Sequence, residues 1–283
     1  MANVGLVLKR NTPAATILAR RVIAWCEAQG HLPLLEPESA DMLGAEAATK
    51  PEMFERGDAV VVLGGDGTLL ATARLAGLRE VPIVGVNLGT LGFLAETQEG
   101  EIESVLAAAL AGEAPIDRRR MLHATVRHAS GRTTVHQALN DAVLSRGSLG
   151  RTIDIEARID GDYLARFNAD GLIVGTPTGS TAYNLSAGGP LIHPSVRVLL
   201  LSPICPHTLS VRPIVVDDSS ALELRLGDSR EELLLTLDGQ ETVHVAPEDV
   251  VSISRSPHLA CLVASAELSF YDLLRTKLGW ALP

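Results

Sequence analysis

The chain has 283 residues, of which 46% are apolar, and its formal net charge at pH 7 is -10. This length and apolar content allow a large buried core and predict two domains. The negative charge argues against nucleic acid or an anionic membrane as the main partner, and we interpret the one basic cluster, Arg118-Arg119-Arg120, as a solvated linker.

The cysteines and the N-terminus indicate the compartment. Cys26, Cys205 and Cys261 are odd in number and widely spaced among apolar residues, which predicts reduced thiols in a cytoplasmic protein. The first apolar segment is too short for a signal peptide, and the longest apolar runs are shorter than a membrane span. We therefore expect no membrane partner.

The first part of the chain alternates short apolar strands with helical stretches, the pattern of a parallel α/β sheet. We expect strands at Val4–Leu8, His31–Leu35, Asp58–Leu63 and Pro82–Val86, and helices from Pro13 to Gly30, over Leu69–Arg74 and over Glu101–Leu110. The predicted Rossmann-like domain covers 1–112, and the helical stretch in 268–283 returns to it.

A glycine turn follows the third of these strands. Gly64-Gly65-Asp66-Gly67-Thr68 lies at a strand-to-helix corner, where backbone amides and a helix N-terminus favour phosphate oxygens. A carboxylate at Asp66 would repel phosphate unless it binds Mg²⁺ or accepts a proton from an attacking hydroxyl, and both roles belong to phosphoryl transfer. Because two-glycine turns after strands are common, an ordinary turn remains an alternative.

The chain has no P-loop. Its only lysines are Lys9, Lys50 and Lys277, and we expect none of them to lie near the glycine turn. The charge of a transferring phosphate would then be neutralised by backbone amides, arginine and a divalent metal.

Beyond Met121 the sequence consists of short β-rich segments separated by Gly, Asp and Pro. This pattern predicts that residues 113–267 form an all-β domain, either an antiparallel sandwich or a barrel. The predicted strands are Thr133–Leu144, Ile153–Ile159, Gly171–Gly175, Ala221–Leu226, Glu232–Leu237 and Val250–Ser254.

Residues 170–190 are dense in glycine and hydroxyl groups directly after an apolar strand, which predicts a binding wall for a base or sugar, with an ordinary glycine-rich turn as the alternative. Asn140-Asp141 interrupts another apolar strand, and either a β-bulge, a hairpin corner or a ribose diol would satisfy these side chains. Asp238-Gly239 is typical of a type I′ hairpin turn. His207 is either a loop residue or a phosphate contact.

Together these segments resemble the NAD kinase family in order and spacing over almost the whole chain. The resemblance is carried by Gly64–Thr68, Asn87–Leu94, Asn140-Asp141, Asp170–Pro190, Pro206–Leu209 and Asp238–Gln240. The first motif is shared with lipid kinases and phosphofructokinases, whereas the segment 170–190 is specific to NAD kinases.

The resemblance implies a two-domain homodimer or homotetramer with a crevice between its domains. It also implies a reaction, the transfer of a phosphoryl group from ATP or polyphosphate to the 2′-hydroxyl of the adenosine ribose of NAD, giving NADP. Asp66 would be the general base, with Gly64, Gly65, Gly67 and Thr68 holding substrate, donor phosphates and Mg²⁺.

The same resemblance assigns the nucleotide site. Asn140 and Asp141 would bind nucleoside hydroxyls and base, and Phe93 would pack near the adenine. Further candidates for this site are Arg151, Asn168, Asp170, Thr181, Ala182, Tyr183, Asn184, Leu185, Ser186, His207 and Gln240.

Three positions depart from the family pattern. Asp141 stands where many members have glutamate, Asn168 where some bacterial members have a basic residue, and Asn184 where serine is frequent. These departures bear on cofactor affinity and donor preference. Two other functions remain alternatives: a lipid or sugar-phosphate kinase with the same glycine turn, and an NAD(P) sensor without turnover.

Overall fold

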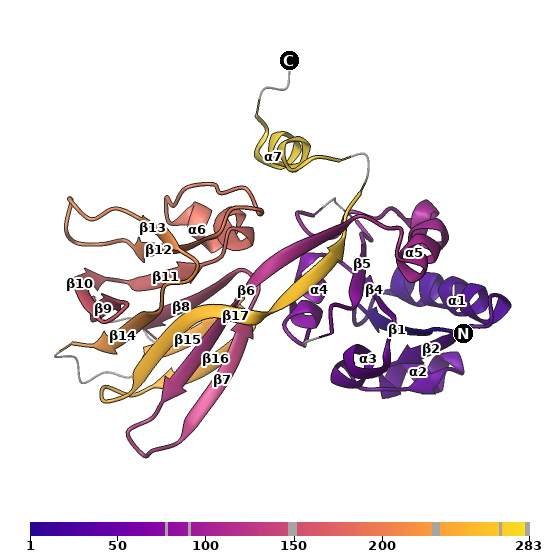
Figure 1. Ribbon diagram of the computed structural model, residues 1–283, viewed down its shortest axis with the longest axis horizontal. Coiled ribbons are helices and arrows are strands. Elements are labelled where there is room, and N and C mark those ends of the chain that lie inside the picture. The colour runs from indigo at the N-terminus through magenta and orange to yellow at the C-terminus, as the bar shows by residue number, and fades with distance from the viewer. Residues whose placement is uncertain (77–78, 90–91, 147–151, 228–232, 266–267, 281–283) are drawn as a thin grey trace. The chain divides into compact units, whose positions relative to one another are not determined.

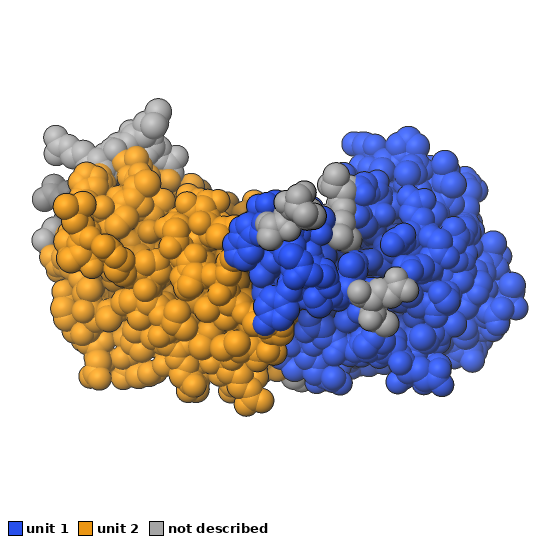
Figure 2. All heavy atoms as spheres, turned by 90° about the horizontal axis from the view of Figure 1, so that it is seen from above, with its two compact units in different colours: residues 1–118, 258–283 blue, residues 119–257 orange. Residues whose placement is uncertain are grey.

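The computed structural model divides the chain into two compact units. Unit 1 comprises residues 1–118 and 258–283, and unit 2 comprises residues 119–257 (Figure 2). The structure describes residues 1–76, 79–89, 92–146, 152–227, 233–265 and 268–280. The chain passes from one unit to the other within two long strands. The boundaries expected from composition, at 112 and 268, lie a few residues outside these strands.

Unit 1 contains a parallel sheet of the predicted kind (Figure 1). Its strands are β1 (Asn3–Leu8), β2 (Leu32–Leu35), β3 (Glu46–Ala47), β4 (Ala59–Leu63) and β5 (Pro82–Val86). Its helices are α1 (Pro13–Ala28), α2 (Pro37–Leu43), α3 (Lys50–Arg56), α4 (Asp66–Ala73), α5 (Ile102–Ala111) and α7 (Phe270–Leu278).

The strand order β3-β2-β1-β4-β5 places a topological switch between β1 and β4. The chain winds outward from β1 through β2 and β3 and then returns to the other side of β1 with β4. Ligands of such sheets bind at the carboxyl ends of the strands that flank the switch. Here β1 pairs with β4 up to Leu8 opposite Leu63, so the loops that begin at Lys9 and Gly64 leave the sheet side by side.

Local sequence explains the main elements of unit 1. All five residues of β4 are buried, as expected of a central parallel strand. The helix α1 has proline in its first turn and buries Leu18, Val22 and Cys26 at helical spacing. The helix α3 has a capping box in which the Thr49 hydroxyl accepts from the Glu52 amide. The sequence interpretation missed this helix together with α2 and β3.

Unit 2 is a sandwich of two antiparallel sheets. One contains β6 (Ile116–Arg127), β7 (Thr133–Ala138), β9 (Ile153–Ile159), β10 (Asp162–Ala169), β14 (Leu222–Leu226) and β17 (Val250–Val263). The other contains β8 (Asp141–Arg146), β11 (Gly171–Gly175), β12 (Val198–Ile204), β13 (Ile214–Asp217), β15 (Leu233–Leu237) and β16 (Glu241–Val245).

The core of unit 2 lies between these sheets, with Leu144, Leu172 and Leu235 from one and Ile155 and Ile253 from the other. The expected strand Thr133–Leu144 is in fact two strands, because the chain leaves one sheet after β7 and enters the other at β8.

Two long strands run across the boundary between the units. The later part of β17 pairs in parallel with β5, where Cys261 lies opposite Pro82, whereas its earlier part pairs with β14 in unit 2. In β6 the arginine triplet is not the solvated linker we expected. Arg119 is buried and donates to the Thr178 hydroxyl at 3.4 Å, because a β-strand turns alternate side chains inward.

Candidate active site

The glycine turn leads from a buried strand into a helix, as the sequence indicates. A Cβ atom on Gly64 would lie 2.7 Å from the Thr68 hydroxyl oxygen, so this position admits only glycine without rearrangement. Gly65 caps α4, and a Cβ placed there would meet nothing within 4 Å. The turn therefore packs closely on one side and is open on the other, where a bulky oxyanion can approach the amides.

The carboxylate of Asp66 is fixed by the loop that follows β5. The Phe93 N–H donates to Oδ2 at 2.8 Å. The N–H groups of Leu94 and Ala95 donate to Oδ1, each at 3.2 Å. Asp66 is half-buried, and Oδ2 keeps an acceptor position beyond this one bond. The carboxylate is thus held in one orientation while it can still accept a proton.

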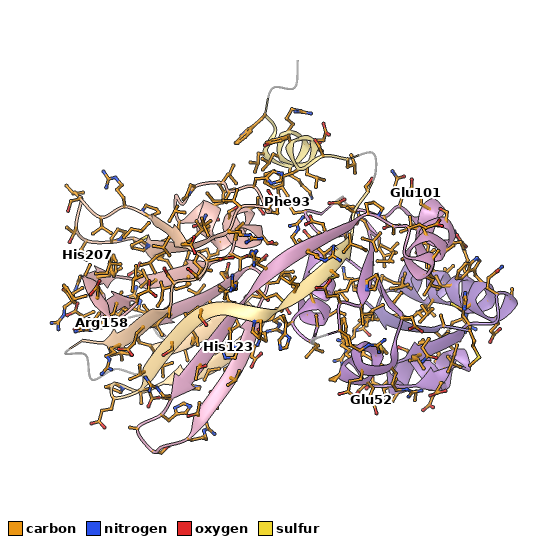
Figure 3. All side chains as sticks on the ribbon, viewed as in Figure 1. Glu52, Phe93, Glu101, His123, Arg158 and His207 are labelled. Carbon is orange, nitrogen blue, oxygen red and sulfur yellow. The ribbon has the colours of Figure 1, made fainter. Side chains whose placement is uncertain are left out.

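Gly92 precedes these three donors and contacts the carboxylate directly. A Cβ atom on Gly92 would lie 2.0 Å from Oδ1 of Asp66. No other residue type can allow so close an approach of the backbone. In the predicted segment Asn87–Leu94, Thr90 and Leu91 lie outside the described residues. Figure 3 labels the half-exposed Phe93.

The structure corrects one expectation about charge. Lys9 lies beside the glycine turn, because its N–H donates to the Leu63 carbonyl at 2.9 Å and its Cβ would be 3.3 Å from a Cβ on Gly64. Lys9 and Arg10 are both exposed, and neither has an ion-pair partner within the described part of the chain. They line a cavity of about 870 Å³ at the ends of β1 and β2. Lys9 and Gly64 are far apart in the sequence, and the parallel pairing of β1 with β4 brings them together.

Asn140-Asp141 forms the corner at which the chain changes sheets. The Thr176 hydroxyl donates to the Leu139 carbonyl at 2.6 Å, and the Thr176 N–H donates to the Asn140 carbonyl at 2.9 Å. On the other side of the corner, the Asn140 N–H donates to the Asp238 carboxylate at 2.7 Å. The corner is therefore held on both sides by hydrogen bonds rather than by a regular strand ladder.

The corner borders a pocket in unit 2. A cavity of about 340 Å³ is lined by Asn140, Asp141, Val143, Ser145, Ala182, Tyr183, Thr236, Asp238 and Gly239. Burial, and then the charge of Asp238, raise the pKa of Asp141 to about 7. The structure thus brings four predicted site residues together: Asn140, Asp141, Ala182 and Tyr183.

The segment after β11 folds into a 3₁₀ turn (Thr178–Thr181) and the short helix α6 (Tyr183–Ser186). Asn184 is fully buried: its amide group donates to the Pro190 carbonyl at 3.0 Å, and its oxygen accepts from the Ser202 hydroxyl at 2.7 Å. Because none of this side chain is exposed to a ligand, we assign it an internal structural role instead of the predicted nucleotide contact.

The neighbours of Asn184 in this segment remain accessible. Thr181, Ala182 and Leu185 are partly exposed, whereas Tyr183 and Ser186 are exposed. They form the outer surface of the segment that the sequence interpretation assigned to nucleotide binding.

The remaining candidates in unit 2 are more scattered. Asp170 forms an ion pair with Arg146 at 3.2 Å. Asn168 and His207 are exposed, and Figure 3 labels His207. They are joined through the backbone, where the His207 N–H donates to the Asn168 carbonyl at 3.0 Å. Gln240 is exposed just after the Asp238-Gly239 turn. Arg151 lies outside the described residues.

The single carboxylate of Asp66 fits a metal ion that arrives bound to the phosphates of a substrate. Within the described ranges there is no cluster of three or more His, Cys, Asp or Glu residues that would hold an ion alone. Mg²⁺ needs no such cluster, because it keeps several waters and binds through one or two carboxylates together with substrate phosphates. Waters on such an ion would reach Asp66, which would leave the acceptor position on Oδ2 open. Over the described residues, no helix has both the length and the apolar content to cross a membrane.

Comparison with known proteins gives the family. The model of the ATP-NAD kinase N-terminal domain matches residues 4–114, and that of the ATP-NAD kinase C-terminal domain matches residues 139–265. The NAD kinase of Geobacter metallireducens is 43% identical over 280 residues, which cover 99% of each chain. The NAD kinase of Geobacter sulfurreducens is 43% identical over 281 residues, again 99% of each chain.

Two solved structures are similar in fold. Yeast NADH kinase complexed with NADH has a TM-score of 0.90 and 28% identity, and the match covers 100% of this chain and 89% of the yeast chain. An NAD kinase from Archaeoglobus fulgidus in complex with ATP has a TM-score of 0.78 at 24% identity, covering 98% of each chain. The family models and the full-length relatives agree, and this chain therefore belongs to the NAD kinase family.

Proposed function

We propose that this chain transfers the terminal phosphoryl group of ATP to the 2′-hydroxyl of the adenosine ribose of NAD, which gives NADP and ADP. Membership of the NAD kinase family supports the reaction. The observation that carries the mechanism is the Asp66 carboxylate, held by three backbone amides with one acceptor position left on Oδ2.

Asp66 is the general base in this proposal. A ribose hydroxyl is a weak nucleophile at neutral pH, and its proton passes to Oδ2 as the new oxygen–phosphorus bond forms and the bond to the leaving ADP breaks. The three amides limit rotation of the carboxylate, so that the acceptor stays oriented toward the hydroxyl. This positioning contributes to the rate in addition to proton transfer itself.

The cavity beside Asn140 and Asp141 supports nucleotide binding in unit 2. Its size of about 340 Å³ suits one base or sugar, and its lining combines a carboxylate, an amide and the Tyr183 ring. Family resemblance further places Asp170, Thr181, Ser186 and Gln240 in the NAD site, and Phe93 near the adenine. These assignments are proposals for mutagenesis.

The open glycine turn supports binding of the donor phosphates, and Lys9 and Arg10 add positive charge at the same sheet edge. Mg²⁺, bound with the donor phosphates near Asp66, would offset negative charge on the donor. Backbone amides at the start of α4 would hold the phosphate oxygens. We propose ATP as the donor, and polyphosphate is the second donor to test.

The deciding assay is incubation of the purified protein with ATP, Mg²⁺ and NAD, followed by detection of NADP. Formation of NADP that is lost in Asp66→Asn supports the proposal. Calorimetric NAD binding without product would instead support a sensor. Phosphorylation of a lipid or a sugar phosphate in place of NAD would support another kinase with the same turn. Repeating the assay with polyphosphate and without Mg²⁺ defines the donor and the metal requirement.

We also propose a homodimer or homotetramer in the cytoplasm, as in the family. The three cysteines, which are all unpaired in the structure, support a reducing compartment. Light scattering of the purified protein measures the subunit number, and fractionation of the source cells gives the location.

A further inference from the structure

One carboxylate accepts every backbone donor of the corner between β7 and β8. The Leu139 N–H donates to Oδ2 of Asp238 at 2.9 Å. The N–H groups of Asn140 and Asp141 donate to Oδ1, at 2.7 and 3.2 Å. The Asp238 N–H in turn donates to the Asp141 carbonyl at 2.9 Å. We infer that Asp238 is a positioning residue of the nucleotide site, which fixes this corner and places a second negative charge beside Asp141.

The hairpin that carries Asp238 does not itself need a carboxylate. Asp238 and Gly239 have φ angles of 51° and 65°, and the Gln240 N–H donates to the Leu237 carbonyl at 2.9 Å, as in a type I′ turn. Asparagine and glycine suit these positions equally well. The requirement for aspartate therefore comes from the corner that its side chain holds.

The corner needs these hydrogen bonds because the chain changes sheets there. β7 ends at Ala138 and β8 begins at Asp141, so the intervening amides have no continuous ladder partner. Leu139 is fully buried, and a buried amide must be paired within the protein. Without the Asp238 carboxylate, the corner would keep only the bonds from Thr176 to its carbonyl groups, and the amides of Leu139, Asn140 and Asp141 would lose their common acceptor.

Asp238 also acts on Asp141 through its charge. Asp141 is only 4% exposed, and burial together with the negative charge of Asp238 raises its pKa to about 7. Among the described residues that line the cavity, Tyr183 is the other titratable one, and the residue opposite Asp141 on β11 is Gly175. If ionised Asp141 accepts hydrogen bonds from the nucleotide, affinity rises with pH through this range. Removing the charge of Asp238 lowers the pKa of Asp141 and moves the rise to lower pH.

The test uses Asp238→Asn and Asp238→Gly, which both suit the turn, and Asp249→Asn as the matched control. Asp249 is a carboxylate of unit 2 that is 3% exposed and accepts the Ala129 and Ala246 amides at 2.9 and 3.0 Å. It also contacts Nδ1 of His128 at 2.8 Å, and it does not line the cavity. The control therefore removes a similar buried group at a distance from the nucleotide site.

The first measurement is amide hydrogen exchange of the unliganded protein. We expect the amides of residues 139–141 to exchange at least about 10-fold faster in Asp238→Gly, which removes all three acceptor bonds, and less so in Asp238→Asn, which keeps one oxygen. Asp249→Asn should leave them unchanged. If Asp238→Gly does not fold, Asp238→Asn carries the comparison. Unchanged exchange in the folded Asp238 variants would overturn the inference.

The second measurement is the dissociation constant of NAD by calorimetry between about pH 5.5 and 8.5. We expect affinity in the unmodified protein to rise with pH, and the midpoint to shift at least about half a pH unit toward acid in Asp238→Asn but not in Asp249→Asn. An unshifted midpoint contradicts the electrostatic part of the inference. This part rests on the proposed function: if the unmodified protein does not bind NAD, that function fails, while hydrogen exchange still decides whether Asp238 positions the corner.

Discussion

Gly92→Ala should slow the reaction strongly by displacing Asp66, the carboxylate that we propose as the general base. The added methyl carbon would lie 2.0 Å from Oδ1 of Asp66, whereas a Cβ atom essentially never lies within 3.0 Å of a non-bonded heavy atom, so the carboxylate or the loop must move by about 1 Å. A displacement of this size at a reacting group can lower the rate about 10²-fold. We therefore expect kcat for NADP formation to fall about 10²-fold. The effect on the dissociation constant of NAD should be smaller, because the cavity that we propose for NAD lies in unit 2.

Gly89→Ala provides the matched control in the same loop, because a Cβ on Gly89 would meet nothing within 4 Å. The assay is NADP formation at saturating ATP and NAD, with thermal melting to establish that both variants are folded. Loss of a general base costs about 10²- to 10⁴-fold in rate. If a folded Gly92→Ala variant keeps its activity within about threefold of the unmodified protein, the role assigned to the Asp66 carboxylate is refuted.

Three further variants test other parts of the account. Asp66→Asn should still bind NAD but lower kcat by about 10²- to 10⁴-fold, which steady-state kinetics with calorimetry will measure. Lys9→Ala should raise KM for ATP about 10- to 150-fold without changing KM for NAD, because a charge-assisted hydrogen bond contributes about 1.5–3 kcal/mol. An unchanged KM for ATP would exclude a phosphate contact. Asn184→Ala should lower the free energy of unfolding by about 1–3 kcal/mol in urea titrations, since it leaves the buried Ser202 hydroxyl unpaired.

The sequence predicted the parallel half of the fold well where apolar strands alternate with amphipathic helices. β5 was predicted with its observed ends, and β4 within one residue, because buried central strands are continuous runs of β-branched residues. The region 37–56 was missed. Its helices have only seven residues each and β3 has two, so neither hydrophobic period repeats often enough to stand out.

The candidate site was predicted only where the relevant residues are adjacent in sequence. The Asp66 turn and the Asn140-Asp141 pair were identified from local pattern and family resemblance. Lys9 was placed away from the turn, although strand pairing brings it beside Gly64. Asp238 was interpreted as a turn residue, and no local feature distinguishes it from an ordinary Asp-Gly hairpin. Its contacts span nearly a hundred residues of sequence, and such pairings depend on tertiary packing.

The two strands that cross the unit boundary limit how this protein can be divided or recombined. Unit 1 needs residues 258–263 of β17, because Cys261 and Leu262 cover the edge of β5. A fragment ending at residue 118 would leave that edge exposed and prone to intermolecular pairing. Chimeras between relatives should therefore exchange residues 119–257 as one internal cassette, with both junctions matched strand for strand, rather than be joined at a single crossover point.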